Sequence, residues 1–238
     1  MLSASNMPTP HQTTSYSEPT TVLVLPAFTL VENVTPATVP TLLDSIVSQA
    51  PTTTSPLRPF SLPRSLPAPL PEGTPAAIRD LTTRPCPHRA LILLCSQKTR
   101  DARCGQSAPL LRKEFQRHLQ PLGLYRDLDD ERPGGVGIYF ISHVGGHKYS
   151  ANVMVYRRAG GFGEGSDEKA EKVDSKEEGK KEEADKGDVG AAQCIWLARV
   201  RPEDCEGIVK FTVLQGKVVK PERQLRGGFD REKGLLSW

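Results

Sequence analysis

Apolar and polar positions follow one another in blocks along the second half of the chain, and these blocks predict strands and helices in turn. Residues 90–94 form an uninterrupted apolar run, which is typical of a strand covered on both faces. An amphipathic helix is predicted after Ser107, which would cap it, with Pro109 in its first turn. Later apolar segments predict three more strands and a second helix, over residues 136–141, 152–157, 194–200 and 202–214.

The resulting order, β-α-β-β-β-α, is that of a thioredoxin-like α/β domain, in which helices flank a mixed β-sheet. We expect this domain to span residues 85–230. Residues 159–190 interrupt it as a disordered insertion, because residues 163–188 hold eleven acidic side chains and six lysines and cannot form a core. Residues 231–238 are expected to form a C-terminal tail.

The first part of the chain has a different composition. Sixteen of the 21 prolines occur at or before position 87, whereas 19 of the 20 glycines come after it. We expect residues 1–20 to be disordered, because they are rich in Ser, Thr and Pro. Residues 21–50 hold one predicted strand and one predicted helix, the remnant of an N-terminal domain, and residues 51–84 read as a Pro-rich linker. This whole region is expected to be largely irregular.

Charge and hydropathy exclude several classes of protein. The 31 basic and 28 acidic residues leave a formal net charge of only +3, which gives no indication of nucleic-acid binding. The chain has no apolar run of about 18 residues, so membrane insertion is not expected. The first 57 residues contain neither Lys nor Arg and thus lack the basic region of a secretory signal or a mitochondrial presequence. We therefore expect a protein that is not secreted, and the sequence leaves mitochondrion and cytoplasm open.

Two pairs of metal-ligating residues follow two of the predicted strands. Cys95 and Cys104 enclose a polar segment, and His143 and His147 come directly after the strand over 136–141. Loops at the carboxyl ends of neighbouring strands converge in an open α/β sheet, so both pairs are expected at one site. Two thiolates and two imidazoles form a complete set of four ligands for a metal.

The neighbouring residues favour this interpretation over isolated surface histidines. Basic side chains between the two cysteines, at Lys98, Arg100 and Arg103, would stabilise the thiolate form that a metal requires. Glycines adjoin both pairs, at Gly105, Gly145 and Gly146, and permit close approach of the backbone to a cofactor. Lys148 and Asn152 follow the histidines and, with Arg103 and Gly105, are the candidates for contacts around the ligands.

Three kinds of chemistry are compatible with these four residues. A [2Fe–2S] cluster takes two ligands on each iron, which suits one pair of cysteines and one pair of histidines. A structural zinc site is the alternative, although eight residues between two thiols exceed the usual zinc spacing. A thiol–disulfide oxidoreductase is the third possibility, although the chain lacks the Cys-x-x-Cys pair that favours such chemistry.

The same motifs resemble one known family. The resemblance rests on Cys95-x8-Cys104-Gly105, residues 141–149, Asn152, residues 196–200 and Arg226-Gly227-Gly228, and it points to the sucrase/ferredoxin-like proteins. It implies a thioredoxin-like ferredoxin domain that binds a [2Fe–2S] cluster through Cys95, Cys104, His143 and His147. It further implies electron transfer with a redox partner protein. Members of the family usually have a longer N-terminal region than this chain.

The remaining cysteines and the last residues allow simpler interpretations. Cys86 is expected to be an exposed linker thiol, and Cys194 and Cys205 to be small core residues. Leu236, Ser237 and Trp238 resemble a C-terminal tripeptide that is recognised by the cytosolic iron–sulfur assembly machinery. The alternative is an apolar terminus that packs on its own domain.

Overall fold

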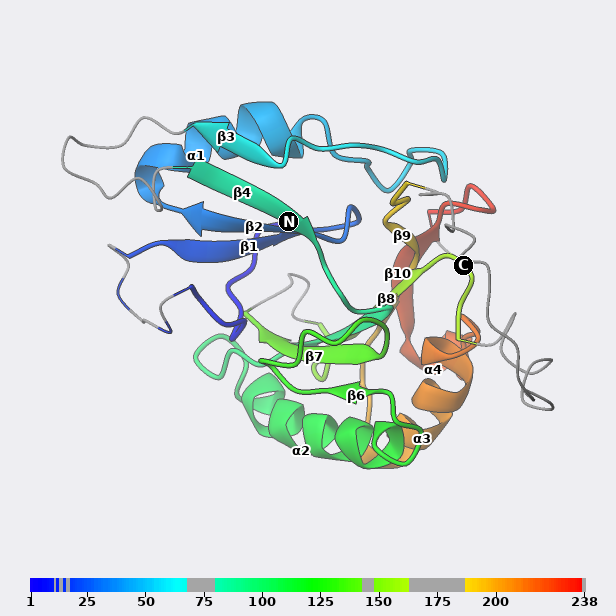
Figure 1. Ribbon diagram of the computed structural model, residues 1–238. Helices are drawn as coiled ribbons and strands as arrows, with labels where there is room; N and C mark the ends of the chain where they lie inside the picture. Colours follow the sequence, from blue (N-terminus) through cyan, green and yellow to red (C-terminus); the bar gives the residue numbers. More distant parts are fainter. Residues whose placement is uncertain are drawn as a thin grey trace, which may run out of the picture.

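The computed structural model describes residues 1–10, 12, 15, 18–67, 80–142, 148–162 and 187–236. Two β-sheets pack face to face in this structure, and each sheet carries helices on its outer face (Figure 1). Three clusters of buried side chains fill the spaces between successive layers. The mixed α/β class predicted from the sequence is therefore confirmed, with a second sheet in addition.

The first sheet is antiparallel and has four strands, in the order β1 (Thr20–Val24), β2 (Thr29–Val34), β4 (Asp80–Pro85) and β3 (Ser65–Pro67). A helical segment covers its outer face and consists of η1 (Pro36–Thr38), α1 (Val39–Leu42) and the π-helical turn η2 (Leu43–Val47). Successive side chains of β2 point to opposite faces: Leu30 packs toward the second sheet, and Val31 packs toward the helical segment with Ile46.

The second sheet has six strands, in the order β10 (Leu225–Asp230), β9 (Ala191–Leu197), β8 (Val153–Arg158), β5 (Ala90–Cys95), β7 (Val136–Ile141) and β6 (Tyr125–Arg126). The strand pairs β5–β7 and β6–β7 are parallel, and the other neighbours are antiparallel. Helical segments cover the outer face and the end of this sheet, namely α2 (Ala102–Leu119), η4 (Pro202–Asp204), α3 (Cys205–Gly207), the π-helical segment η5 (Ile208–Val213) and α4 (Pro221–Gln224). The strands and the two helices predicted after residue 85 are present, with shifted bounds.

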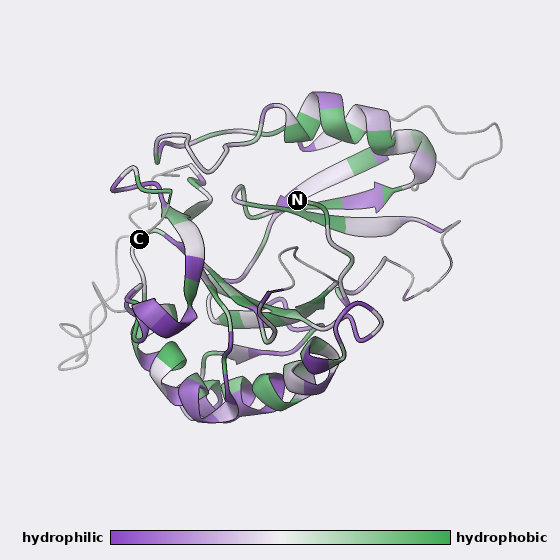
Figure 2. Cartoon of the chain, turned by 180° about the vertical axis from the view of Figure 1, so that it is seen from behind, coloured by the Kyte–Doolittle hydropathy of each residue, from purple (hydrophilic) through white to green (hydrophobic). Residues whose placement is uncertain are grey.

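Burial on both faces explains the apolar run of β5. Its alternate residues Ala90, Ile92 and Leu94 pack against the helices, and the other three, ending in Cys95, face the first sheet. Every side chain of the strand is buried. Figure 2 shows the same arrangement as hydrophobic central strands beneath helices whose outward residues are polar.

Arg158 joins the two sheets. Its guanidinium donates hydrogen bonds to the backbone oxygens of Cys86 (3.0 Å) and Phe28 (3.4 Å), forms an ion pair with Asp188, and lies 4.7 Å from the centre of the Phe28 ring. Backbone acceptors at a buried boundary between layers need such donors. One side chain at the end of β8 therefore supplies the polar contacts that the apolar layer cannot provide.

The N-terminal region holds more regular structure than the sequence predicts. Residues 51–84, expected to form a linker, contribute β3 and β4 instead. β4 contains proline only at its last position, and β3 is an edge strand, where proline is tolerated. Ser142 donates its N–H to the oxygen of Ala4, and Asn6 donates its N–H to the oxygen of Phe140. The described part of residues 1–20 thus pairs with the edge that the short strand β6 leaves open on β7.

His88 makes the layer between the sheets sensitive to acid. Its ring is 2% exposed, and Nε2 lies 3.1 Å from the hydroxyl of Tyr139. Burial disfavours the charged imidazolium and lowers the pKa of His88 from 6.5 to about 4. The unfolded chain therefore binds a proton between these pH values when the folded chain does not, so stability falls as pH drops from 6.5 toward 4.

We expect His88→Phe to remove this part of the pH dependence. Between pH 7 and pH 5, His88 should account for a loss of roughly 2 kcal/mol in the free energy of unfolding, measured by urea denaturation. Each protein is compared with itself at the two pH values, so a constant packing cost of the substitution cancels. An equal loss in the wild type and the variant would contradict the assignment.

Candidate metal centre

Cys95 occupies the carboxyl end of β5. Its side chain is 2% exposed, and its N–H donates to the oxygen of Asn152 at 3.1 Å. In the parallel register Cys95 lies level with Ile141, the last residue of β7, and the next N–H, of Ser96, donates to Ile141 at 2.9 Å. The end of β5 is therefore held by β7 on one side and by the segment before β8 on the other.

Cys104 lies in the first turn of α2. The helix begins at Ala102 and not after Ser107 as the sequence predicts, because the Asp101 side chain accepts the N–H of Arg103 at 3.0 Å and caps it. The apolar pattern that marks the helix starts only later in the sequence, which explains the missed turn. Cys104 is 2% exposed, and the positive end of the helix dipole stabilises a negative charge in this turn.

The two thiols belong to one cluster of buried side chains. Cys95 and Cys104 share this cluster with Tyr139, Ile141 and Met154, on the face of the second sheet opposite the helices. Neither sulfur takes part in a disulfide. Two reduced thiols from separate elements therefore lie in the same buried apolar layer.

Of the basic residues between the thiols, Arg103 forms an ion pair at the helix cap. It donates from Nε and Nη2 to the carboxylate of Asp101, at 3.1 and 2.9 Å, and its side chain is 63% exposed. These hydrogen bonds lower the pKa of Asp101. Arg103 also interacts electrostatically with Cys104. Lys98 and Arg100 are exposed.

The predicted histidine ligands lie outside the described residues, as do Gly145 and Gly146. The structure nevertheless fixes where their segment begins. Ile141 is level with Cys95, and His143 follows Ile141 by two residues in the sequence. Among the described residues no group of three metal-ligating side chains gathers, since only the two cysteines of the predicted set are included.

Asn152 connects Cys95 to the neighbouring strand. Its side chain is buried, Oδ1 accepts the indole N–H of Trp196 at 3.2 Å, and Nδ2 donates to the oxygen of Tyr149 at 2.8 Å. The backbone oxygen of the same residue accepts the N–H of Cys95. Asn152 therefore orders the segment that follows the predicted histidines, consistent with its expected place beside the ligands.

Three cations surround the ring of Tyr149, and sequence reasoning assigned no function to two of them. Arg199, Arg226 and Lys148 lie 4.0, 4.4 and 5.4 Å from the ring centre, measured from the guanidinium carbons and the ammonium nitrogen. Arg226 also lies 5.6 Å from the ring of Trp196. A hydrogen bond from Lys148 and the charges of both arginines lower the pKa of Tyr149. The only signal in the sequence was the presence of Arg199 and Arg226 within the family motifs.

Arg226 also carries an unsatisfied donor. Its Nη1 is buried and has no hydrogen-bond partner among the described residues. A buried guanidinium N–H without an acceptor is costly, and in a native protein it indicates a ligand, an ion or a water. Together with two reduced, buried thiols, this donor is compatible with a metal cofactor that carries hydrogen-bond acceptors.

Gly105 allows the loop after β5 to pack on the first turn of α2. A Cβ at this position would lie 2.6 Å from the Cβ and 2.9 Å from the Cα of Lys98. The backbone of Lys98 would have to move, and with it the loop that joins Cys95 to Cys104. The sequence predicts that the backbone at Gly105 lies close to a cofactor. In the structure it lies close to Lys98 of the same chain.

The other cysteines are core residues. Cys86, expected to be exposed, is 4% exposed, because the strand β4 leads it beneath Phe28. Burial raises the pKa of its thiol, raises that of Cys194 to about 12, and raises that of Cys205 as well. These three thiols are thus held in the neutral form, and Cys86 and Cys194 share the buried cluster of Cys95 and Cys104.

The C-terminal tripeptide and the acidic insertion are described by the structure only in part. Leu236 is 56% exposed, and Ser237 and Trp238 lie outside the described residues. Most of the acidic insertion, residues 163–186, is likewise outside them. None of the helices in the described part of the chain combines the length and apolarity needed to cross a bilayer.

We expect Gly105→Ala to destabilise the protein by roughly 1–3 kcal/mol, because overpacking forces the Lys98 backbone to shift. Urea denaturation at neutral pH measures this change. Gly207→Ala is the matched control, since a Cβ there meets nothing within 4 Å. A cost equal to that of the control would show that the loop does not depend on Gly105.

Comparison with known proteins shows which of them the chain is similar to. Actin patches distal protein 1 of Saccharomyces cerevisiae is 52% identical over 82 residues, which are 33% of this chain and 26% of that protein. Altered inheritance of mitochondria protein 32 is 33% identical over 130 residues in Debaryomyces hansenii and 29% identical over 133 residues in Clavispora lusitaniae. These matches cover 55% and 56% of this chain and 33% of each relative.

The chain thus matches about a quarter to a third of the length of these curated relatives. No solved structure was found to match it. The model of the sucrase/ferredoxin-like family matches residues 1–227, nearly the whole chain. The protein therefore belongs to the sucrase/ferredoxin-like family.

Proposed function

We propose that this protein is an electron carrier that holds a [2Fe–2S] cluster through Cys95, Cys104, His143 and His147. One observation carries the proposal: the parallel register of β5 and β7 sets Cys95 level with Ile141, two residues before the first histidine. The segment that holds the two histidines therefore follows β7 at the end of the sheet where Cys95 lies. This is the arrangement that a cofactor between adjacent strand ends requires.

The thiols have the surroundings that a cluster needs. Both are buried, both are reduced, and both belong to one apolar cluster, so a bound metal group would be shielded from water on this side. Burial of two thiolates without a cation is unfavourable, and a metal removes this cost. When bound, the cluster would supply a site that accepts and releases one electron.

The chain's own residues would hold this site in place. Asn152 accepts the Cys95 N–H and the Trp196 indole N–H, so it fixes the end of β5 against β8 and β9. Asp101 caps the helix that carries Cys104. Arg226 retains an unused N–H at this end of the sheet, which supports the presence of an acceptor. Polar groups of this kind tune the potential of iron–sulfur centres.

Partners and compartment follow from the same assignment. An electron carrier needs a redox partner protein, and Leu236, Ser237 and Trp238 are proposed to engage the cytosolic iron–sulfur assembly machinery. The names of the relatives that refer to mitochondrial inheritance support a mitochondrial or cytoplasmic role.

The purified protein is expected to be coloured and to contain two irons and two acid-labile sulfides per chain. Visible absorption together with iron, sulfide and zinc analysis tests this. Replacing any one proposed ligand, by Cys95→Ala, Cys104→Ala, His143→Ala or His147→Ala, should remove at least most of the bound iron. Cys86→Ala is the matched control, because Cys86 is a buried thiol of the same apolar cluster and should leave the iron content unchanged.

Two outcomes would contradict the proposal. Colourless protein with one zinc per chain, lost in the same four variants, would identify a structural zinc site. Metal-free protein in which Cys95 and Cys104 form a reversible disulfide would identify a thiol–disulfide oxidoreductase.

A further inference from the structure

The Tyr149 cluster, defined as Lys148, Arg199 and Arg226 around the Tyr149 ring, has no assigned role. We propose that it is a docking site for the acidic surface of a partner protein. The inference rests on the proposed function, because it gives the redox partner its chemistry and its place of binding.

The cluster gathers positive charge without local compensation. All three cations lie within 5.4 Å of one ring centre, and no ion pair joins any of them to a carboxylate among the described residues. The nearby acids have other partners. Glu203 pairs with Arg201 at 3.6 Å, and Asp204 binds Lys220 and the amide of Gln224. Like charges at this spacing repel one another, and a bound anion relieves that repulsion.

The backbone holds the cluster in a strained arrangement. Arg199 has a φ of +56° and Ala151 a φ of +51°, a left-handed conformation that side chains other than glycine rarely adopt. The Arg199 N–H donates to the oxygen of Ser150 at 2.9 Å, which fastens the two strained segments together. Strain of this kind is retained where a surrounding function requires it. Here it sets Arg199 against the Tyr149 ring.

The size of the adjoining cavity favours carboxylates of a protein over an enclosed cofactor. A cavity of about 120 Å³ opens beside Arg199 and is lined by Arg199, Arg201, Glu203, Asp204, Lys220, Arg223 and Gln224. Pockets for cofactors and drug-sized ligands measure about 300–1,000 Å³. The cluster thus presents separate cations beside one small cavity. This arrangement matches several acidic side chains on the surface of a partner protein.

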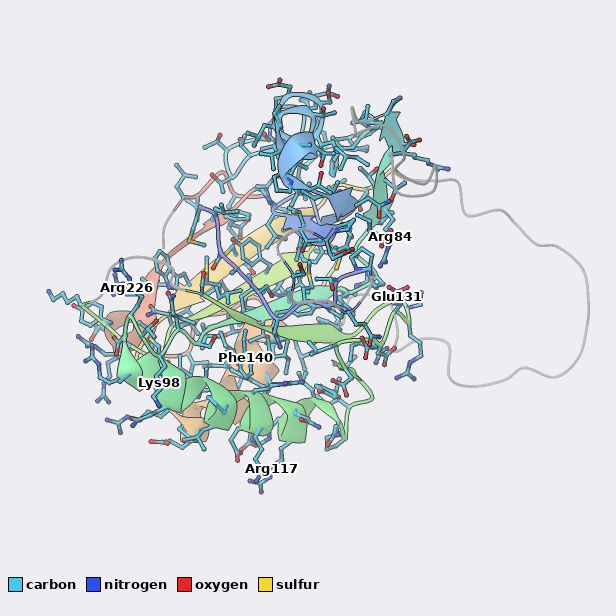
Figure 3. The ribbon with its side chains drawn as sticks, turned by 90° about the vertical axis from the view of Figure 1, so that its left-hand side faces the viewer. Arg84, Lys98, Arg117, Glu131, Phe140 and Arg226 are labelled. Atoms are coloured by element: carbon cyan, nitrogen blue, oxygen red, sulfur yellow. The ribbon has the colours of Figure 1, made fainter. Side chains whose placement is uncertain are left out.

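The cluster lies at the end of the sheet where the proposed ligands converge. The side chain of Asn152 donates to the backbone oxygen of Tyr149, and the backbone oxygen of Asn152 accepts the N–H of Cys95. Figure 3 shows Arg226 on the same side of the molecule as Lys98, which follows Cys95, and away from the Arg84–Glu131 pair. A partner that binds here would be close to the site that exchanges electrons.

The acidic insertion is attached at the opposite end of the sheet. Its flanks follow Arg158 of β8 and precede Ala191 of β9, whereas Val153 and Leu197 mark the end near Cys95. The described residues that flank the acidic segment therefore lie at the end of the sheet away from Cys95.

The first test measures binding of an acidic probe, a fluorescein-labelled peptide of sixteen glutamates, by fluorescence anisotropy. We expect the double variant Lys148→Gln/Arg199→Gln to bind it at least tenfold more weakly than the wild type at low ionic strength. Lys113→Gln/Arg117→Gln removes the same charge from exposed positions of α2, where Figure 3 shows Arg117 at the bottom of the view and away from Arg226, and should change binding less than twofold. Thermal melting confirms that both variants are folded.

Several results would overturn the docking site. Equal weakening in the two double variants would show that only net charge matters. Displacement of the peptide by inorganic phosphate, under conditions where chloride of equal ionic strength has no effect, would identify a small-anion site. Tenfold tighter binding after deletion of residues 163–186 would make the chain's own acidic segment the occupant.

The second test uses electron transfer with oxidants of opposite charge. Ferricyanide and hexaamminecobalt(III) each take one electron from the reduced protein, and stopped-flow absorbance records the loss of the reduced form. The Lys148→Gln/Arg199→Gln variant should react severalfold more slowly with the anionic oxidant and faster with the cationic one. Unchanged rates with both oxidants would overturn the inference while leaving the electron carrier intact. Protein without a reducible centre would overturn the proposed function, and the peptide test would still decide the docking site.

Discussion

Burial of β5 on both faces is the constraint on which the rest of the structure depends. A six-residue strand without one exposed side chain requires a covering layer on each side, so the helices and the first sheet are both needed to complete the fold. The same requirement acts on the last residue of the strand. Cys95 is buried because the first sheet covers its face, and its thiol is therefore shielded from bulk solvent.

The sequence predicts those parts of the fold in which hydrophobic period and element type agree. β5 and β7 are apolar runs and were predicted within one residue of their observed bounds. β4 was missed because Leu81 is its only large apolar residue, and β10 because two glycines interrupt its pattern. These strands form through pairing with neighbours that are distant in the chain, and such pairing leaves no local periodicity.

The candidate site likewise contains residues that the sequence pointed to and residues that it did not. Two thiols and two histidines could be proposed as a ligand set, because each pair lies within one short segment of sequence. The Tyr149 cluster could not, because Lys148, Arg199 and Arg226 come from three separate segments that only the antiparallel register of β8, β9 and β10 brings together. Asp101 was missed for another reason. A capping carboxylate acts through one hydrogen bond and has no hydrophobic signature.

The polar contacts at the two ends of the second sheet serve different purposes. At the end of β8, Arg158 has every kind of partner that a buried guanidinium can use, namely backbone oxygens, a carboxylate and an aromatic ring. At the opposite end, Arg226 has two aromatic rings, yet one of its buried nitrogens has no acceptor in the part of the chain that the structure describes. Since buried donors are otherwise satisfied in folded proteins, the first arginine completes the fold by itself, whereas the second calls for a group from outside the described chain. This asymmetry agrees with the place of the cysteines, which mark the same end of the sheet.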